Sequence, residues 1–361
     1  MPAPSHAPAP SGPAPSVAGQ ANWWGRVKNL LSLPRRERLP VAATPADIAW
    51  QDNKLQLLRY RQRPQGLAHP IPVLLVPSLI NRHYVLDLTP GKSFVEFMVQ
   101  RGFDVYCIDW GAPTAEDRYI TFDDIVDRMV GRALRKVCQL SAQPQAHVLG
   151  YCMGGTLAAI HAAAHPERFA SLTAVAAPVA FDRAGPMAEW LRSGHFDVDA
   201  LVRANGVVPS TLLQSSFQLL RPTLPLAKAV NLIDRAWNDK FLDGYLAMET
   251  WANDNVGLPG EFYRTYVRDL YQHDQLRSGT FALSGQRVQL SAVCCPVLTV
   301  AFTVDSIAPQ ECCTPLANLV GSVRVQRVLF DGSHVGGMTS GPAAKGLWPQ
   351  IAAFWSSIPS A

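Results

Sequence analysis

The sequence predicts an α/β fold in which a mostly parallel sheet carries helices on both faces and is interrupted by a mainly helical insertion. From residue 47 onward, short apolar runs alternate with helical stretches, as expected for buried parallel strands joined by crossover helices. This rhythm breaks at residues 180–288, which are rich in aromatic and helix-forming residues, and then returns. A chain of 361 residues is long for one compact domain and short for two large ones, which favours one domain with an insertion.

The N-terminal region divides into two segments of different character. Residues 1–21 are rich in Pro, Ala and Ser and offer little apolar surface to bury, so we expect a disordered tail. Residues 22–46 form a basic, amphipathic segment. Its apolar residues fall at helical spacing, at Trp23, Trp24, Val27, Leu30 and Leu31. Two interpretations stay open: a short helix docked on the core, or a helix lying on a lipid-like or polymer surface.

The predicted core has two parts, residues 47–179 and 289–361, on either side of the insertion at 180–288. It opens with a hairpin, formed by residues 48–50 and 55–60. The strands that follow are expected, buried on both faces, at residues 72–76, 104–108, 146–149, 172–176, 297–302 and 323–329. The helices between them are expected at residues 93–102, 122–140 and 156–165, the last ending before Pro166. Crossovers of this length give a parallel sheet.

A cysteine occupies a sharp turn between a strand and a helix of small residues. The turn reads Gly150-Tyr151-Cys152-Met153-Gly154-Gly155. It has the form of the nucleophile elbow of the α/β-hydrolase fold, with cysteine where lipases have serine. Gly150 and Gly154 are expected for steric reasons, since side chains there would strike the neighbouring helix and strand. For a bare Gly-x-Cys-x-Gly match the alternative is a buried structural cysteine, but the strand–turn–helix context favours Cys152 as a nucleophile.

In this fold the catalytic partners follow the nucleophile in the order acid, then histidine. The strand at residues 297–302 delivers Asp305, and the last strand delivers His334. Asp331 is an alternative acid on the same turn as His334, whereas Asp109 would put the acid out of order. We therefore predict a Cys152–His334–Asp305 triad.

Two backbone N–H groups are needed to stabilise the oxyanion of the reaction. Met153, directly after the nucleophile, is expected to supply one. The second is expected from the loop after the first long parallel strand, where we choose Ile80.

Composition and cysteine usage exclude several other classes of protein. A net charge of +4 without a dense basic stripe does not favour a nucleic-acid partner. The seven cysteines, with adjacent pairs at Cys294-Cys295 and Cys312-Cys313, resemble neither a disulfide framework nor a CxxC zinc site, because strand neighbours point to opposite faces. The N-terminus has no signal-peptide pattern, and no apolar run reaches the roughly 18 residues of a transmembrane helix. We expect a cytoplasmic protein with reduced thiols, no metal and no cofactor.

Several segments together resemble the polyhydroxyalkanoate synthases. The cysteine turn is similar to the lipase-like box of that family, and residues 77–88 are similar to its oxyanion segment. The strand region of the family is matched by residues 102–106 and 108–111, and its cap by Trp251-Ala252-Asn253-Asp254 with Pro259, Phe262 and Tyr271. The resemblance covers roughly residues 45–358. In length the chain resembles the short synthases (class III or the related class IV), whose catalytic subunit works with a second, non-catalytic subunit.

The resemblance implies a synthase that polymerises 3-hydroxyacyl-coenzyme A, such as 3-hydroxybutyryl-coenzyme A, through an acyl thioester on Cys152. The coenzyme A would be part of the substrate. Expected partners are a second copy of the chain, a non-catalytic synthase subunit and the surface of cytoplasmic polyester granules. One departure is that the family usually has Asp-His at the acid, where this chain has Asp305-Ser306. A cysteine thioesterase or hydrolase of the same fold, and a non-catalytic granule-associated protein, are the alternatives.

Overall fold

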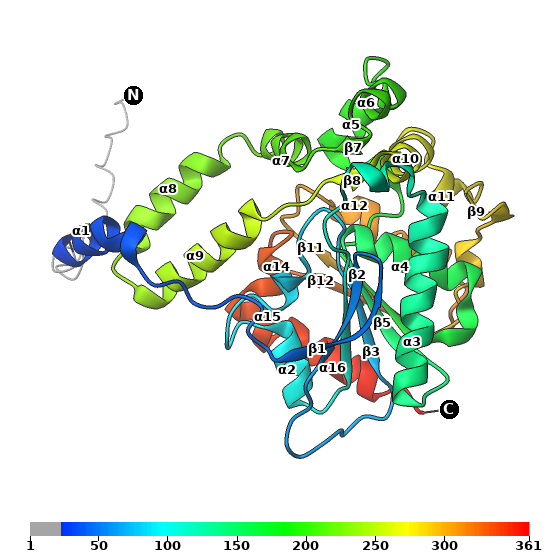
Figure 1. The fold of residues 1–361 in the computed structure, drawn as a ribbon, viewed down its shortest axis with the longest axis horizontal. Coiled ribbons are helices and arrows are strands. Elements are labelled where there is room, and N and C mark those ends of the chain that lie inside the picture. Colours follow the sequence, from blue (N-terminus) through cyan, green and yellow to red (C-terminus); the bar gives the residue numbers. More distant parts are fainter. Residues whose placement is uncertain (1–22, 361) are drawn as a thin grey trace, which may run out of the picture. The chain divides into compact units, whose positions relative to one another are not determined.

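The computed structural model describes residues 23–360, so the prediction for the tail at residues 1–21 lies outside the described residues. At the centre is an eight-stranded sheet with the strand order β1-β2-β4-β3-β5-β6-β11-β12 (Figure 1). Its strands are β1 Ala46–Asp52, β2 Leu55–Tyr60, β3 Val73–Val76, β4 Val105–Asp109, β5 Ala146–Tyr151, β6 Phe169–Val175, β11 Val297–Phe302 and β12 Val325–Phe330. The predicted α/β fold is confirmed.

Strand directions follow the predicted pattern of an opening hairpin and a parallel remainder. β1 pairs antiparallel with β2, and β2 pairs antiparallel with β4. All the other neighbours in this sheet are parallel, with β3 lying between β4 and β5, and β11 between β6 and β12. The carboxyl ends of the parallel strands therefore meet at one edge of the sheet, where ligand and catalytic sites of open α/β sheets lie.

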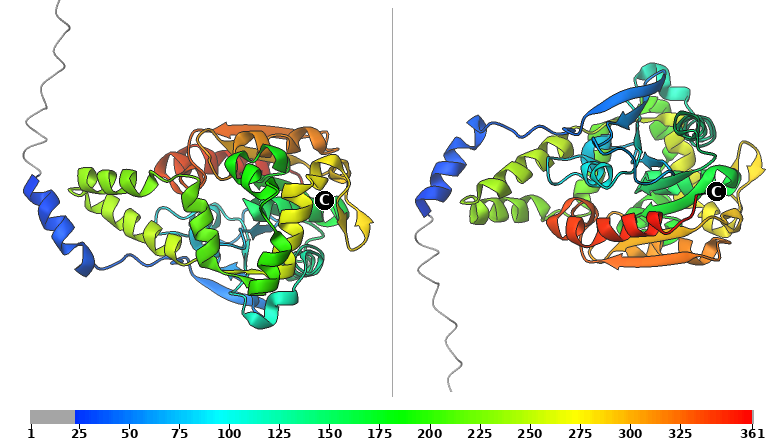
Figure 2. Two further views of the ribbon diagram at one scale, coloured as in Figure 1. Left: turned by 90° about the horizontal axis from the view of Figure 1, so that it is seen from above. Right: turned by 90° about the horizontal axis from the view of Figure 1, so that it is seen from below.

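Helices cover both faces of the sheet because alternate strand residues point to opposite sides. In β3, Leu74 and Val76 belong to one apolar core, and Val73 and Leu75 belong to the other. The first core is covered by α3 Gly131–Ser141 and α4 Met153–Ala164, and the second by α2 Phe94–Gln100 and α16 Leu347–Ser356 (Figures 1 and 2). Short helices complete the second part of the core: α12 Gln310–Cys313, α13 Leu316–Leu319, α14 Gly336–Thr339 and α15 Gly341–Lys345.

Two elements differ from their predicted form. The last strand was expected to be buried on both faces, but β12 has a single neighbour, lies at the sheet edge and leaves Leu329 55% exposed. An edge strand has a neighbouring strand on one side only, and a run of apolar residues does not show whether a strand lies at the edge or in the centre of the sheet. The helix predicted at residues 122–140 begins with the π-helical turn η5 Asp124–Val130 before α3 starts at Gly131.

Residues 180–288 are mainly helical, as expected. Their helices are α5 Gly185–Arg192, α6 Val198–Asn205, α7 Ser210–Leu219, α8 Leu224–Arg235, α9 Asp239–Asn253, α10 Gly260–Thr265, the π-helical η8 Tyr266–Gln272 and α11 Gln275–Ser278. Two short antiparallel pairs accompany them: β7 Val207–Val208 with β8 Leu258–Pro259, and β9 Ala282–Leu283 with β10 Gln286–Arg287.

The chain divides into two compact units, which are described separately. The larger contains residues 40–222 and 247–361, and so holds the sheet and most of the insertion. The smaller contains the described part of residues 1–39 together with residues 223–246. The middle of the predicted insertion thus groups with the N-terminal segment.

In the smaller unit, the predicted N-terminal helix is α1 Trp23–Ser32. Asn29 donates a hydrogen bond to the carbonyl of Ala236 at 2.8 Å. The guanidinium of Arg36 contacts the carboxylates of Asp239 at 2.8 Å and Asp243 at 2.7 Å. These polar contacts hold the N-terminal segment to α8 and the start of α9, and α1 itself contributes no fully buried side chain.

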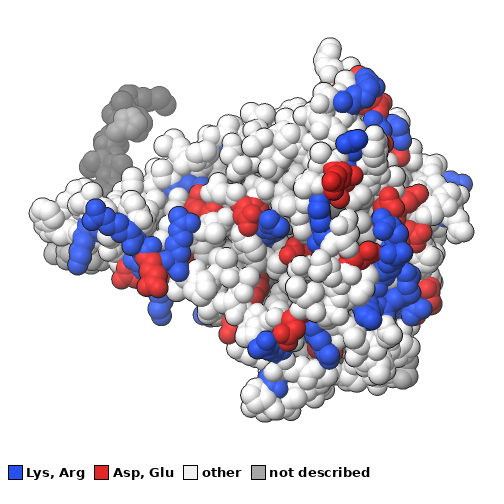
Figure 3. All heavy atoms as spheres, viewed as in Figure 1, with Lys and Arg blue, Asp and Glu red and all other residues white. Residues whose placement is uncertain are grey.

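None of the helices in the described residues combines the length and the apolar character that crossing a membrane requires. On the face shown in Figure 3, basic side chains are accompanied by acidic ones across the described surface. This mixed distribution matches the small net charge of the sequence.

Candidate active site

The turn between β5 and α4 holds Cys152 in a conformation that L-residues rarely adopt. Its backbone has φ 55° and ψ −128°, and its N–H donates to the carbonyl of Val175 on β6 at 2.9 Å. A strained non-glycine residue of this kind persists only where the surroundings fix it, and such residues cluster at functional sites. The strand–turn–helix expected around Cys152 is present.

Gly150 and Gly154 have the steric role expected of them. A Cβ added at Gly154 would lie within contact distance of the carbonyl oxygen of Val76 and 2.6 Å from that of Pro77. A Cβ at Gly150 would lie 2.6 Å from the carbonyl oxygen of Gly154. Because these obstacles are backbone atoms, they cannot rotate away, and only glycine lets the turn sit so close to β3.

The predicted acid and base lie together at the carboxyl ends of β11 and β12. Nδ1 of His334 is 2.7 Å from Oδ2 of Asp305, and both residues are buried. The other carboxylate oxygen, Oδ1, accepts the backbone N–H groups of Ile307 and Ala308, each at 2.9 Å. Asp305 is therefore fixed by its own loop and in turn fixes the orientation of the imidazole.

The two alternative acids have other partners. Asp331 is exposed and accepts a hydrogen bond from the hydroxyl of Thr303 at 2.8 Å. Asp109 pairs with His83, with 3.4 Å between Oδ2 and Nδ1. The structure thus brings Asp305 to His334 and leaves Asp109 and Asp331 elsewhere.

His334 interacts with Cys152 as well as with Asp305. Burial by itself lowers the pKa of His334, but the Cys152 thiolate and the Asp305 carboxylate together raise it to about 10. The site therefore stabilises the imidazolium form of His334. A base whose charged form is stabilised in this way can take the thiol proton and later return it to a leaving group.

Tyr151 belongs to the site and was missed by sequence reasoning. Its hydroxyl donates to the backbone carbonyl of His334 at 2.9 Å, and its ring stacks on the imidazole with 5.4 Å between centroids. Burial is the largest cause that raises its pKa far above the ordinary range, so it stays a neutral donor. The only signal in the sequence was its position directly before Cys152, at the carboxyl end of a predicted strand.

The two predicted oxyanion donors both border the cavity in front of Cys152. Met153 is the first residue of α4, so its N–H has no acceptor within the helix. The N–H of Ile80 lies 3.4 Å from the hydroxyl of Ser78, and its carbonyl accepts the N–H of Val256 at 2.9 Å. The inserted segment therefore helps to hold the Ile80 loop in place.

The cavity in front of Cys152 has a volume of about 110 Å³ and is mainly apolar. Most of its walls come from the inserted segment, and include Met187, Leu191, Phe196, Leu213, Phe217, Tyr263, Tyr266 and Tyr271. Burial raises the pKa of Tyr263 to about 12, so its hydroxyl is uncharged. The site combines a thiol, an imidazole oriented by a carboxylate, and a largely apolar space that could hold an acyl chain.

The adjacent cysteines are not arranged as expected, because Cys312 and Cys313 lie in the short helix α12 and are both buried. Their sulfur atoms are 3.7 Å apart, and each thiol contacts a backbone carbonyl. Among the described residues, one group of three side chains could hold a metal ion: Asp127, His161 and His165.

Comparison with known proteins places the chain in a family. The model for the α/β-hydrolase fold matches residues 71–339, and the model for the N-terminus of poly-β-hydroxybutyrate polymerase (PhaC) matches residues 39–98. The poly(3-hydroxyalkanoate) polymerase subunit PhaC of Haloferax mediterranei is 34% identical over 86% of this chain and 63% of its own length. That of Allochromatium vinosum is 31% identical over 90% of this chain and 91% of its own.

Solved structures agree on the fold. A monoacylglycerol lipase from Paleococcus ferrophilus aligns with a TM-score of 0.51 at 17% identity, covering 84% of this chain and 99% of that one. An esterase from Thermogutta terrifontis aligns with a TM-score of 0.51 at 18% identity, covering 88% and 98%. The chain has the α/β-hydrolase fold and belongs to the family of poly(3-hydroxyalkanoate) polymerase subunits PhaC.

Proposed function

We propose that this enzyme polymerises 3-hydroxyacyl groups from coenzyme A thioesters into polyester, with Cys152 as the covalent carrier of the chain. The observation that carries the proposal is the constellation of Cys152, His334 and Asp305 at one sheet edge, in a member of the polymerase family. A 3-hydroxyacyl group supplies both an activated carbonyl carbon and the hydroxyl that attacks the next one.

The first step transfers an acyl group from one sulfur to another. His334 removes the proton from Sγ of Cys152, and the thiolate attacks the carbonyl carbon of the substrate. The N–H groups of Met153 and Ile80 are the proposed donors to the oxyanion. When the carbon–sulfur bond to coenzyme A breaks, the leaving thiolate takes the proton from His334. Exchange of one thioester for another costs little free energy, so the acyl group stays activated.

The second step forms the ester bond. The 3-hydroxyl of another hydroxyacyl unit attacks the thioester on Cys152, and its proton passes to His334 as the carbon–sulfur bond breaks. Asp305 acts as a positioning residue, which is supported by the fact that both of its oxygens already accept hydrogen bonds. The largely apolar cavity supports transfer to a hydroxyl over hydrolysis, because its walls offer few hydrogen-bond partners to an ordered water.

Product analysis tests this function against thioester hydrolysis. The chain is incubated with 3-hydroxybutyryl-coenzyme A, with and without a second synthase subunit, and coenzyme A, free acid and polymer are quantified. Polymer is expected from the wild type, and neither polymer nor coenzyme A release from Cys152→Ala. Free 3-hydroxybutyrate without polymer would establish a thioesterase instead, and full activity of Cys152→Ala would refute the covalent mechanism.

Exposed apolar side chains of the smaller unit support a location at the polyester surface. Leu226, Val230 and Ile233 follow one another at helical spacing on α8 and are 70%, 60% and 52% exposed. Trp24 on α1 is 79% exposed. A helix with one exposed apolar face and charged neighbours suits an interface between water and an apolar phase, which favours the second of the two interpretations of the N-terminal segment.

Granule fractionation tests this location. The double variant Leu226→Ser/Ile233→Ser is expected to move to the soluble fraction while still releasing coenzyme A. Leu329→Ser, which changes a leucine of the larger unit that is 55% exposed, is the matched control. Granule binding by the double variant at the wild-type level would contradict the proposal. Light scattering, with and without the second subunit, tests the expected association with a second copy of the chain and with that subunit.

A further inference from the structure

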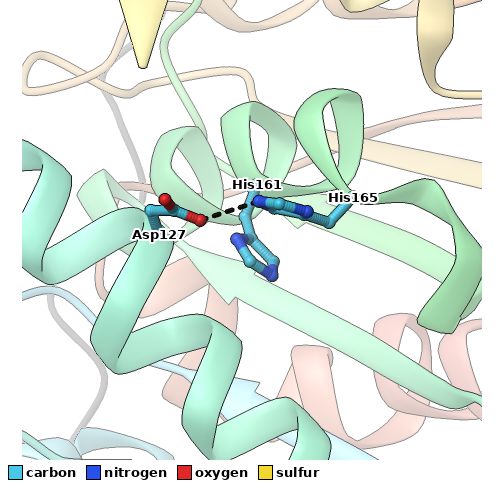
Figure 4. A group of neighbouring side chains, drawn as sticks. All are labelled: Asp127, His161 and His165. Atoms are coloured by element: carbon cyan, nitrogen blue, oxygen red, sulfur yellow. Dashed lines mark hydrogen bonds and ion pairs between the residues drawn. The ribbon is translucent and has the colours of Figure 1, made fainter. Parts of the chain in front are cut away.

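Three metal-binding side chains lie together at the far end of the nucleophile helix from Cys152. His161 and His165 are four residues apart on α4 and its C-terminus, so they lie on the same helix face. Asp127 comes from the π-helical turn η5, and Figure 4 shows the three side chains gathered between the two elements. One ligand atom from each residue lies within 4.8 Å of those of the other two.

One member of this cluster is a buried imidazole that hydrogen-bonds to the backbone of Val126 and has one nitrogen without a partner. His161 is 3% exposed, and its Nδ1 has no hydrogen-bond partner among the described residues. An imidazole nitrogen without a hydrogen-bond partner can coordinate a metal ion. Without such a ligand, the unsatisfied buried nitrogen costs free energy.

The other two members are already in contact, and Asp127 has an outer hydrogen bond of the kind that orients a metal ligand. Nε2 of His165 is 2.7 Å from Oδ1 of Asp127. The second carboxylate oxygen, Oδ2, accepts the hydroxyl of Ser284 from the β9–β10 turn at 2.8 Å. Hydrogen bonds of this outer kind fix the orientation of a coordinating carboxylate.

We propose that Asp127, His161 and His165 form a binding site for a divalent late transition-metal ion, most simply Zn²⁺. Two imidazole nitrogens and one carboxylate oxygen are a donor set for Zn²⁺ rather than for Mg²⁺ or Ca²⁺, which take oxygen ligands. The side chains of His165 and Asp127 are 42% and 34% exposed, so an ion can enter from solvent and retain water as its fourth ligand.

The geometry requires a modest closure of the cluster. With metal–ligand bonds of about 2.0–2.1 Å in tetrahedral geometry, ligand atoms are about 3.4 Å apart, so a pair separated by 4.8 Å has to approach by about 1.4 Å. The half-exposed side chains of Asp127 and His165 can make this movement. Binding replaces the Asp127–His165 hydrogen bond, and His165 then coordinates through Nε2 as the tautomer that carries its proton on Nδ1.

The side chain of Arg135 on α3 approaches Gly131 next to that of His161, so its positive charge opposes the site. Its side chain is exposed and free to turn toward water.

The role of the ion is structural. His161 follows Cys152 by nine residues, about 13 Å along the helix axis. An ion there would fasten α4 to η5 and the β9–β10 hairpin without touching the reacting atoms, contrary to our expectation that the chain holds no metal.

The test measures Zn²⁺ binding to the purified, metal-depleted full chain after alkylation of its accessible thiols. The variants are His165→Gln and Asp127→Asn, which remove a ligand, and Ser284→Ala, which removes an outer contact. His195→Gln changes an exposed histidine elsewhere and is the matched control. Circular dichroism verifies that each variant is folded, and competition with a chromophoric chelator gives stoichiometry and affinity.

One Zn²⁺ per chain is expected for the wild type and for His195→Gln. Ser284→Ala should bind about 10–100-fold more weakly, and the two ligand variants should lose more than that. Zn²⁺ should also raise the thermal unfolding midpoint of the wild type and not that of His165→Gln. Equal affinity in the wild type and in His165→Gln, or no stoichiometric binding by the wild type, would overturn the proposal. Because none of these readouts uses polymer synthesis, the result is independent of the proposed function.

Discussion

The hydrogen bonds around Asp305 make Asp305→Asn a direct test of how the base is oriented. Two backbone N–H groups donate to Oδ1 at 2.9 Å, so the carbonyl oxygen of an asparagine would be held in that position. Its NH₂ group would then occupy the place of Oδ2, which lies 2.7 Å from Nδ1 of His334. Because the amide donates where the carboxylate accepts, the proton of a neutral His334 is forced onto Nε2. That nitrogen faces the thiol and can no longer accept its proton.

The size of the loss follows from this wrong tautomer. The equivalent change in Ser-His-Asp enzymes costs about 10⁴-fold in kcat. A thiol is more acidic than a serine hydroxyl and depends less on its base, so we expect kcat for coenzyme A release to fall about 10²–10³-fold, or about 3–4 kcal/mol. Asparagine keeps the shape and the two backbone contacts, so the fold should be retained.

The assay is steady-state coenzyme A release from 3-hydroxybutyryl-coenzyme A, and Asp331→Asn is the matched control. Asp331 is exposed and contacts Thr303 rather than the base, so its variant should keep kcat within about twofold of the wild type. The reasoning fails if Asp305→Asn retains kcat within about threefold of the wild type, or if Asp331→Asn loses as much.

Three further changes test the rest of the site. Gly154→Ala should destabilise the fold by about 3 kcal/mol or more, because its Cβ meets two backbone oxygens, whereas Gly194→Ala, with nothing within 4 Å, should stay within about 0.5 kcal/mol in urea unfolding. The raised pKa of His334 gives stability that is complete below pH 6.5 and is lost as pH rises toward about 10. Cys152→Ala should lower the pKa measured for His334 by NMR and flatten this loss, and an unchanged pKa would contradict the thiolate–imidazolium contact. Leu213→Phe, in the cavity wall, should reduce kcat/KM about tenfold more for long than for short acyl chains, and equal losses would show that the acyl group lies elsewhere.

The fold and the grouping of Cys152, Asp305 and His334 could be predicted because each follows from a local pattern with a strict physical cause. Buried parallel strands need continuous apolar runs, and a nucleophile at positive φ between two backbones needs Gly150 and Gly154. The order of the strands then carries Asp305 and His334 to the edge at which Cys152 lies. The sequence alone could not decide which carboxylate contacts the imidazole of His334. That choice depends on the backbone of the Asp305 loop, whose own N–H groups hold Oδ1 and so direct Oδ2 toward His334.

The features that sequence reasoning missed all join elements that are distant along the chain. Tyr151 acts through the carbonyl of His334, which lies 183 residues further on. The histidines of the proposed metal site could have been noticed as an i, i+4 pair, but such a pair on a helix is common. Only the π-helical turn that brings Asp127 to His165, 38 residues away, turns the pair into a donor set. A regular α-helix was predicted where this turn occurs, and each residue gained by its wider coil changes which side chains face α4. The π-helical turn η5, which the sequence did not predict, therefore assembles the candidate metal site. This site lies at the end of α4 opposite to Cys152.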